Sequence, residues 1–283
     1  MKILVIYNPV AGSKKLINTK KAIQDTLKKS KYDYKWFETV KAEKQPFEQF
    51  LNKKFDRIIV SGGDGTVAEV ASFLVKNKIK TPLIILPQGS ANILALSLRL
   101  PMGTKAALNK GLKGKGKPLD IMKINNKKYG LIAAGCGYDT LVMKDTPRKL
   151  KRKIGALAYL WTILKTIFYY RSRPYKISID GKRHTIIAKA IMAFNIFPIR
   201  HLKIAEPFVG HQILPDDGLL NIYALNPRPI RDFLKFSKAM KVFTGKKISI
   251  KSKKNKKFQI DGNVFKGKSL NLEVMPKAIR IVY

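Results

Sequence analysis

Apolar residues follow two alternating patterns along the first 119 residues of the chain. Short continuous apolar runs predict buried strands, and between them apolar residues recur at the three- and four-residue spacing of helices. An order in which strands and helices alternate predicts a parallel sheet with helices on both faces. We expect strands at Lys2–Tyr7, Tyr34–Glu38, Arg57–Val60 and Leu83–Leu86, and helices at Thr19–Lys29, Glu43–Asn52, Val67–Lys76 and from Ala91.

From Asp120 onward the apolar runs become short and mostly alternate with polar residues. Asp-Gly pairs at 180–181, 217–218 and 261–262 are typical of tight turns between strands. This pattern predicts an antiparallel β-sandwich with one inserted helix at Ile154–Tyr170. The expected strands are Ile121–Ile124, Lys128–Ala133, Lys176–Ile179, Thr185–Phe194, Leu219–Leu225, Ile248–Lys251, Phe258–Ile260 and Leu270–Val274.

The predicted fold class is therefore α/β followed by all-β. Residues 1–119 form the domain with the parallel sheet, and residues 120–277 form the β-sandwich domain. The boundary is expected in Gly111–Pro118, where glycine and lysine alternate. The closing run, residues 278–283, is compatible with a strand of either domain.

The net positive charge of the chain indicates an anionic partner. The chain has 283 residues, with 57 Lys and Arg against 18 Asp and Glu, a net charge of +39. Such a chain is expected to bind polyanions. An anionic membrane surface is one interpretation, nucleic acid a second, and simply solvated lysines a third. No recognisable nucleic-acid motif accompanies the basic cluster Lys251–Lys257, so nucleic acid is disfavoured.

Three features bear on the compartment. Cys136 is the only cysteine, which excludes an intramolecular disulfide and a cysteine-based zinc cluster and fits a reducing environment. The first apolar run is too short for a secretion signal. The run Ile154–Tyr170 contains Lys165 and has basic flanks, so it is expected either to pack on its own domain or to lie on an anionic lipid surface. We expect a cytoplasmic protein, at most peripheral on the inner face of the membrane.

The most informative loop is Ser61-Gly62-Gly63-Asp64-Gly65-Thr66, between a predicted strand and a predicted helix. Its glycines let main-chain N–H groups approach an anionic ligand. Thr66 and Glu69 have the spacing of a capping box, which would start a helix here and direct its positive dipole end at the loop. Asp64 would repel a phosphate unless a divalent cation lay between them, which argues for Mg²⁺.

Two further loops follow strands of the same predicted sheet. Asn8–Lys15 offers Gly12, Ser13 and Lys14, and Pro87–Asn92 offers Gly89 and Ser90, a natural helix N-cap. The carboxyl ends of parallel strands meet at one edge, so we expect all three loops there. By contrast, Gly262–Ser269 fits the Walker A pattern of letters, but the residues after it alternate like a strand, and we reject a P-loop.

These loops, in this order, resemble the diacylglycerol kinase catalytic-domain family. That family includes soluble bacterial diacylglycerol and other lipid kinases and sphingosine kinase-like proteins, and it is distantly similar to the NAD kinases. The Gly62–Thr66 loop is the most specific signature. The resemblance extends over essentially the whole chain, through Gly135–Asp139, Lys153–Tyr159, Leu214–Leu220 and Asp261-Gly262.

The resemblance implies a nucleotide-binding α/β domain, a β-sandwich domain that takes a lipid acceptor, and an active site between them. Asp64 would act through Mg²⁺, and Lys14 could steady a phosphate. A second, structural Mg²⁺ would bind Asp217 and the main-chain oxygens of Leu214 and Leu219, and Asp120 matches a further acidic position near that network. ATP would contact Asn8, Lys14, Thr39, Gly62, Gly63, Asp64, Gly65, Thr66, Val67, Ala68 and Ser90.

Two positions depart from the family pattern. Ile93 stands where many members have an aspartate, a change shared with sphingosine kinase-like members. Asn263 stands where many members have a glutamate proposed as general base. An amide cannot accept the proton of the substrate hydroxyl. We therefore predict that Asp261 takes that role.

The expected function is an ATP- and Mg²⁺-dependent kinase that phosphorylates the hydroxyl of diacylglycerol or a related membrane lipid. The alternatives are a kinase of a soluble acceptor, in the manner of NAD kinase, and a non-catalytic homologue that binds nucleotide or lipid. The sequence determines neither the acceptor lipid nor the oligomeric state.

Overall fold

A computed structural model describes residues 1–11, 16–40, 46–50, 53–137, 171–196, 214–226 and 240–283. Its contacts divide the chain into two compact units, each described below by itself: Met1–Leu119 with Lys277–Tyr283, and Asp120–Pro276. Lys14 and the predicted helix at Ile154–Tyr170 lie outside the described residues.

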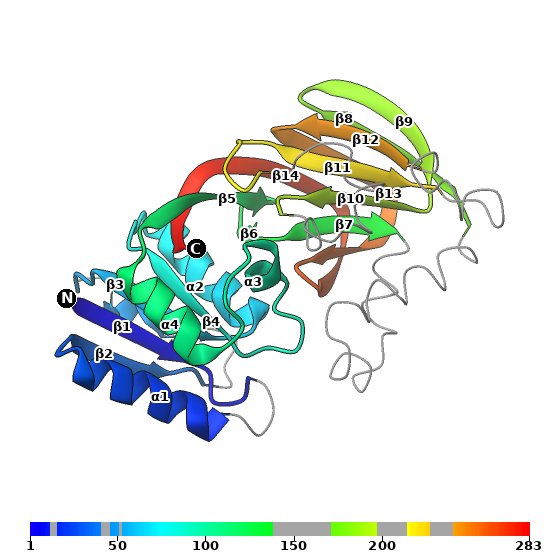
Figure 1. The fold of residues 1–283 in the computed structure, drawn as a ribbon. Coiled ribbons are helices and arrows are strands. Elements are labelled where there is room, and N and C mark those ends of the chain that lie inside the picture. Colours follow the sequence, from blue (N-terminus) through cyan, green and yellow to red (C-terminus); the bar gives the residue numbers. More distant parts are fainter. Residues whose placement is uncertain (12–15, 41–45, 51–52, 138–170, 197–213, 227–239) are drawn as a thin grey trace. The chain divides into compact units, whose positions relative to one another are not determined.

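The first unit is built on a parallel sheet (Figure 1). Its strands are β1 (Lys2–Tyr7), β2 (Asp33–Glu38), β3 (Arg57–Gly62), β4 (Leu83–Pro87) and the end of β14 (Asn263–Val282). Their order across the sheet is β14-β4-β3-β1-β2, with Val5 of β1 opposite both Trp36 and Ile59. The last residues of the chain thus complete this sheet beside β4, where Ile281 pairs with Leu83.

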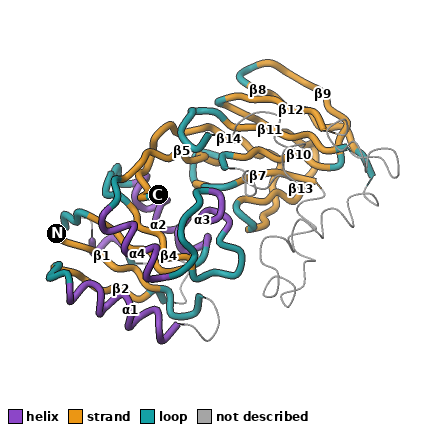
Figure 2. Tube along the Cα trace, viewed as in Figure 1, coloured by secondary structure: helices purple, strands orange, loops and turns teal. Residues whose placement is uncertain are grey.

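Helices cover both faces of this sheet, as predicted (Figure 2). They are α1 (Leu16–Lys29), α2 (Asp64–Lys76), the short α3 (Ile93–Ser97) and α4 (Thr104–Lys113). On one face, Ile23 of α1 and Leu108 of α4 share a core with Val5. Side chains alternate along a strand, so the equally buried Leu4 and Ile6 face the other way. α2 packs against β3 and buries its own apolar stripe, Val67, Val70, Ala71 and Leu74.

Several helix boundaries differ from the predicted ones. α2 begins at Asp64 rather than Val67, α3 begins at Ile93 and lasts only five residues, and α4 was not predicted at all. Arg99 has a positive φ of 53°, which ends the helical turn before Pro101. The described part of the predicted helix Glu43–Asn52 contains a 3₁₀ turn at Phe47–Phe50.

The second unit is an antiparallel β-structure, which confirms the predicted fold class (Figure 1). Strands β12-β11-β10-β7-β13-β14 lie side by side, β5 pairs with β14 and with β6, and the β8–β9 hairpin pairs with β13 through β8. The bounds are β5 (Gly116–Ile124), β6 (Lys128–Gly130), β7 (Ala133–Gly137), β8 (Arg173–Ile179), β9 (Lys182–Ala188), β10 (Ala190–Phe194), β11 (Leu220–Leu225), β12 (Met240–Gly245) and β13 (Lys247–Ile260).

β13 connects the two parts of the sandwich. Its first residues pair with β8, where Ile248 lies opposite Ile179, and its last residues pair with β7, where Phe258 lies opposite Cys136. The register with β14 shifts between Lys251 and Lys256. The two strands predicted at Ile248–Lys251 and Phe258–Ile260 are therefore one irregular strand, since a bulge lets a single strand bend from one layer to the other.

Gly262–Ser269 lies at the turn into β14 and within that strand, with no helix after it, so the rejection of a P-loop is confirmed.

Among the residues that the structure describes, no helix has both the length and the apolar character needed to cross a bilayer.

Candidate functional site

The ends of four parallel strands are joined by hydrogen bonds at one edge of the first unit. The amide of Asn8, after β1, donates to the carbonyl oxygen of Ser61 in β3 at 2.9 Å. The amide of Gln88, after β4, donates to the carbonyl oxygen of Gly62 at 2.9 Å. The amide of Thr39, after β2, donates to the carbonyl oxygen of Tyr7 at 2.9 Å. The predicted gathering of these loops on one edge is confirmed.

Two of the loops touch through glycines. A Cβ on Gly89 would lie 2.6 Å from the Cα of Gly63, and a Cβ on Gly63 would lie 3.1 Å from the Cα of Gly89. Main chain cannot move aside as a flexible side chain can, so this approach requires glycine at Gly89 and favours it at Gly63.

Gly65, in the first turn of α2, presents the opposite situation. A Cβ there would have no atom within 4 Å, and the residue has no positive φ. Packing within the chain therefore does not require glycine at this position. The missing side chain instead leaves open, solvent-exposed space at the first turn of the helix.

The N-terminus of α2 carries no side-chain cap. Gly63 is the N-cap residue, and no side chain accepts a hydrogen bond there. The predicted capping box of Thr66 and Glu69 is wrong, because the helix starts at Asp64 and places Thr66 inside its first turn. The Thr66 hydroxyl instead accepts a hydrogen bond from Asn8 Nδ2 at 2.8 Å. The first amides of α2 and the positive end of its dipole are thus suited to bind an anion.

Asp64 connects α2 with α3. Its Oδ2 accepts the amide of Ile93 at 2.9 Å, and its Oδ1 accepts the amide of Leu94 at 3.0 Å. Burial raises the pKa of Asp64, and these two hydrogen bonds partly oppose the rise. The carboxylate acts as the N-terminal cap of α3 from a different loop. The prediction that Ser90 caps this helix is wrong, because Asn92 is the N-cap residue and Ser90 is exposed.

Asn92 fixes the loop after β4, a role that the sequence did not reveal. Its backbone is left-handed, with φ of 47°. Its Oδ1 accepts the amide of Gly89 at 2.8 Å, and its Nδ2 donates to the carbonyl oxygen of Gly89 at 2.7 Å. The sequence feature that could have indicated this role is an asparagine three residues after a glycine in a loop, since asparagine tolerates the left-handed conformation.

A polar cluster supports the same loop from the side of α1 and α4. The Thr19 hydroxyl donates to Gln88 Oε1 at 3.3 Å, and Gln88 Nε2 donates to the Thr104 hydroxyl at 3.1 Å. Sequence analysis missed this cluster because its three residues are far apart in the chain.

In the second unit, the carboxylate of Asp261 is bound to main chain. Oδ2 accepts the amide of Leu131 at 2.7 Å, and Oδ1 accepts the amides of Ile132 and Ala133, both at 2.9 Å. Asp261 itself has a positive φ of 45° at the turn between β13 and β14. These bonds give Asp261 a structural role, while Asn263 beside it is exposed.

The second predicted metal site falls on a loop that the structure describes from Leu214 onward. Asp120 is buried and holds this loop: its Oδ2 accepts the amide of Gly218 at 2.6 Å. Asp217 Oδ1 accepts the amide of Leu219 at 2.9 Å. The described residues contain no group of three or more acidic, histidine or cysteine side chains placed to hold a metal. A cation here would therefore depend on main-chain oxygens and water.

Comparison with known proteins assigns both units. Residues 2–124 match the diacylglycerol kinase catalytic domain, and residues 132–283 match the YegS C-terminal NAD kinase β-sandwich-like domain. The chain belongs to the family with the YegS C-terminal NAD kinase β-sandwich-like domain, here preceded by a diacylglycerol kinase catalytic domain.

Individual relatives agree with this assignment. A Klebsiella pneumoniae protein named as a probable YegS-like lipid kinase is 28% identical over 252 residues, which cover 82% of this chain and 80% of that protein. A provisionally named lipid kinase of Staphylococcus carnosus is 26% identical over 241 residues, covering 81% and 77%. A solved Bacillus anthracis structure, provisionally named a diacylglycerol kinase, has the same fold: its TM-score is 0.81 at 24% identity, over 100% of this chain and 96% of that one.

The cap that Asp64 provides for α3 predicts a loss of stability on its removal. Asp64→Ala should lower the free energy of unfolding by about 1–2 kcal/mol, because two helix amides lose their acceptor. Asp25→Ala, an exposed acidic residue in the middle of α1, is the matched control and should change it by less than about 0.5 kcal/mol. Urea denaturation followed by circular dichroism measures both, and equal effects would contradict the capping role.

Proposed function

We propose that this protein is an ATP- and Mg²⁺-dependent kinase that phosphorylates the hydroxyl of diacylglycerol or a related membrane lipid. The observation that carries the proposal is the open space at Gly65, in the first turn of a helix that begins at Asp64 and has no side-chain cap. Backbone amides, an absent side chain and one carboxylate are the groups needed to bind a phosphate with its cation.

Those of the proposed nucleotide contacts that the structure describes belong to the end of β3, the loops after β1, β2, β3 and β4, or the first turns of α2. Asn8 and Thr66 are already bonded to each other, and Thr39 is bonded to the end of β1. Exposed Ser90 leaves its hydroxyl accessible to solvent. The full proposed set is Asn8, Lys14, Thr39, the run from Gly62 to Ala68, and Ser90.

The residues present fit a magnesium ion that is shared with a nucleotide. Mg²⁺ in kinases is usually held by one or two carboxylates together with substrate phosphates, rather than by a complete protein cage. Asp64 supplies one carboxylate, each of whose oxygens accepts a single amide hydrogen bond. Mg²⁺ would neutralise charge on the transferred phosphoryl group, and Asp64 would hold it. A structural Mg²⁺ on Asp217 and the oxygens of Leu214 and Leu219 remains a separate proposal.

The names of the relatives support a lipid acceptor, since both are named lipid kinases. The high net charge favours contact with an anionic membrane that contains such a lipid. We propose a cytoplasmic enzyme that meets the inner face of the membrane peripherally.

Proton removal from the acceptor is the least usual feature of the proposed reaction. Asn263 cannot accept a proton. Asp261, the residue proposed to take the proton from the lipid hydroxyl, already accepts hydrogen bonds from three main-chain amides. Phosphoryl transfer depends mainly on positioning and charge neutralisation, so the reaction can proceed with a weak base.

Label transfer tests the function directly. With γ-labelled ATP and Mg²⁺, the protein should label a lipid in mixed micelles of a total lipid extract. The same reaction with NAD as acceptor should give no labelled product. Labelling of NAD alone would replace the lipid acceptor by a soluble one. Nucleotide binding by calorimetry without transfer to either acceptor would instead identify a non-catalytic homologue.

The open space at Gly65 predicts an uncoupling of stability from nucleotide binding. Gly65→Ala should raise the free energy of unfolding by about 0.5–1 kcal/mol, because alanine is the better helix former and meets no neighbour. It should weaken binding of Mg²⁺ and a non-hydrolysable ATP analogue at least about tenfold, because the Cβ fills the space proposed for phosphate.

Gly103→Ala is the control for this test. Gly103 also lies at a helix start, before α4, and a Cβ there has no atom within 4 Å. Its substitution should leave nucleotide affinity unchanged. Unaltered affinity of Gly65→Ala in the same calorimetric titrations would contradict phosphate binding at the N-terminus of α2.

Substitution at Asn263 tests how the acceptor proton is removed. Asn263→Glu restores the carboxylate that many family members carry and should raise kcat about tenfold or more, because general base catalysis is worth about 10²–10⁴-fold where it operates. Asp261→Asn should mainly lower stability, since its bonds to three amides are structural. An unchanged kcat for Asn263→Glu, with kcat lost in a folded Asp261→Asn variant, would identify Asp261 as the base.

A further inference from the structure

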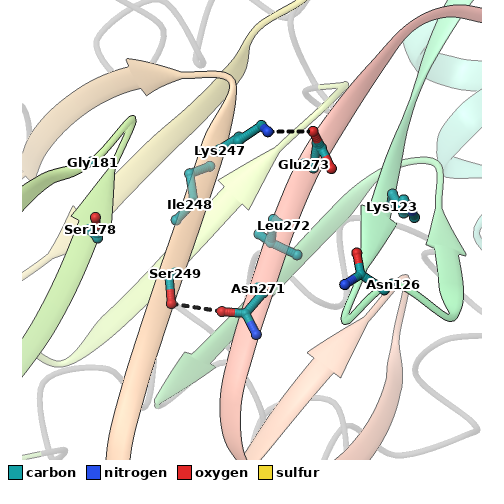
Figure 3. A pocket seen from close by; sticks show the side chains of 10 residues that line it. All are labelled: Lys123, Asn126, Ser178, Gly181, Lys247, Ile248, Ser249, Asn271, Leu272 and Glu273. Atoms are coloured by element: carbon teal, nitrogen blue, oxygen red, sulfur yellow. Dashed lines mark hydrogen bonds and ion pairs between the residues drawn. The ribbon is translucent and has the colours of Figure 1, made fainter.

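Two hollows lie along β14 in the second unit. In the first, polar and charged side chains of the lining bind one another. Its volume is about 240 Å³, and Figure 3 shows the residues that line it. Lys247 Nζ lies 2.9 Å from Glu273 Oε1, and the Ser249 hydroxyl donates to Asn271 Oδ1 at 2.7 Å. Lys247, one of the two lysines that line this hollow, and several of its polar groups therefore already have partners.

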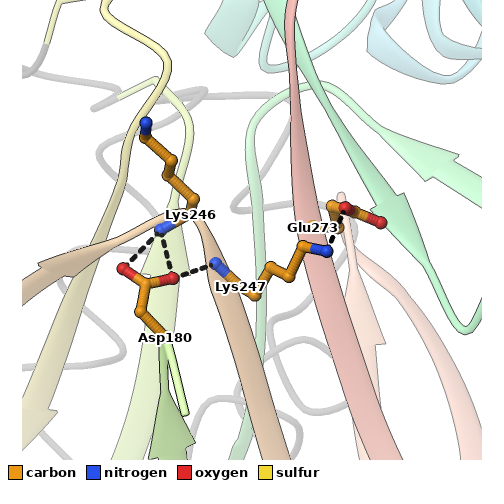
Figure 4. A network of polar contacts seen from close by, with 4 residues as sticks. All are labelled: Asp180, Lys246, Lys247 and Glu273. Atoms are coloured by element: carbon orange, nitrogen blue, oxygen red, sulfur yellow. Dashed lines mark hydrogen bonds and ion pairs between the residues drawn. The ribbon is translucent and has the colours of Figure 1, made fainter. Parts of the chain in front are cut away.

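Main-chain amides beside this hollow also have a hydrogen-bond partner, the carboxylate of Asp180 (Figure 4). The carboxylate of Asp180 accepts the amide of Lys246 at 3.0 and 3.1 Å and the amide of Lys247 at 2.7 Å. Together with the Lys247–Glu273 pair, these bonds stabilise the turn between β12 and β13. This region has the character of a structural network rather than a binding site.

The second hollow has a different composition. Its volume is about 310 Å³, and it lies between the β5–β6 turn and the start of β14. No acidic residue lines it. Four lysines and one aromatic residue do: Lys127, Lys128, Lys266, Lys268 and Phe265.

The part of β13 that pairs with the start of β14 is also rich in lysine, with Lys251, Lys253, Lys254, Lys256 and Lys257. Asp261 is the only acidic residue between Lys251 and Ser269, and main-chain amides bind its carboxylate. In the described part of the chain, the ion pairs are Lys20–Glu38 and Lys247–Glu273, so none involves these lysines. We call the lysines of residues 251–268, with Lys127 and Lys128, the basic hairpin surface.

One pair within the basic hairpin surface is unfavourable for the isolated protein. Lys257 and Lys266 lie directly opposite each other in the register of β13 and β14, and both are exposed. Opposed like charges destabilise a strand pair. An anion bound from outside would relieve that repulsion, so the arrangement suits a surface that meets an anionic partner.

Apolar groups at the hairpin favour a membrane over a nucleic acid. Val264, just after the turn, is 43% exposed and neighbours the partly buried Phe265. Lys128 Nζ lies 5.3 Å from the centroid of the Phe265 ring. An exposed aliphatic side chain among lysines fits the boundary between lipid headgroups and acyl chains, whereas a nucleic acid offers it no apolar phase.

We propose that the basic hairpin surface docks the protein on a bilayer by binding the phosphates of anionic phospholipids, with Val264 at the headgroup boundary. The proposal deepens the proposed function and rests on it for the identity of the partner, since the acceptor lipid lies in such a bilayer. The docking itself requires neither nucleotide nor turnover, so it can be tested separately.

The test compares vesicle binding of two variants with equal loss of charge. One variant carries Lys128→Gln, Lys257→Gln, Lys266→Gln and Lys268→Gln. The control carries Lys21→Gln, Lys28→Gln, Lys105→Gln and Lys110→Gln, exposed lysines of α1 and α4. Sedimentation with vesicles of phosphatidylcholine, with and without phosphatidylglycerol, gives the binding constants without ATP. Circular dichroism shows that each variant is folded.

The hairpin variant should bind phosphatidylglycerol vesicles at least about 50-fold more weakly than the control, since each lysine near an anionic surface contributes about fivefold. Binding of the wild type should also fall with added salt. Equal losses in the two variants would overturn the proposal, because net charge alone would then explain binding. So would a hairpin variant that loses binding to a single-stranded oligonucleotide but keeps binding to vesicles.

Activity on lipid in neutral detergent micelles separates this proposal from the proposed function. The hairpin variant should keep wild-type turnover there, because micelles without anionic lipid do not use the docking surface. Weakened vesicle binding by a protein that phosphorylates no lipid would support docking and contradict the kinase proposal. Lipid phosphorylation by a hairpin variant whose vesicle binding is unchanged would support the kinase proposal and contradict docking through this surface.

Discussion

The carboxylate of Asp64 is the interaction on which the candidate site depends. It begins α2 and, through its bonds to the amides of Ile93 and Leu94, also fixes the start of α3. The loops after β3 and β4 are thereby joined at the point where Gly63 and Gly89 make main-chain contact. The N-terminus of α2 has no side-chain cap, because its N-cap residue is Gly63 and the Asp64 carboxylate binds α3, and it remains suited to an anion.

The same use of aspartate recurs elsewhere and bears on the charge of the surface. Asp120, Asp180 and Asp261 each accept main-chain amides that fix a turn or loop. The chain has 57 Lys and Arg against 18 Asp and Glu, so most of its basic side chains cannot each have an acidic partner. Among the described residues, lysines are dense along the β13–β14 hairpin, where the one acidic residue between Lys251 and Ser269 is Asp261, whose carboxylate accepts main-chain amides at the turn.

The sequence predicted the order of elements well where apolar runs were long. β1, β3, β4 and α1 lie where periodicity placed them, because each buries a continuous apolar run or stripe. It failed at short elements. The helix predicted from Ala91 is the five-residue α3, which ends before the positive φ of Arg99, and α4 was not predicted. β13 looked like two strands because its bulged middle is lysine-rich and buries little.

Local pattern therefore determined the two domains, their fold classes and the three loops that meet on one sheet edge. Glycine, aspartate and serine after buried strands were enough for that, since parallel strands bring their carboxyl ends together. Only the tertiary structure decided what each side chain does there. Thr66 accepts a bond from Asn8, Gln88 is bonded to Thr19 and Thr104, and Asp64 caps a helix 29 residues away. Hydrogen bonds between distant segments leave no periodic trace in a sequence, because the partner is chosen by the folded backbone and not by its neighbours along the chain.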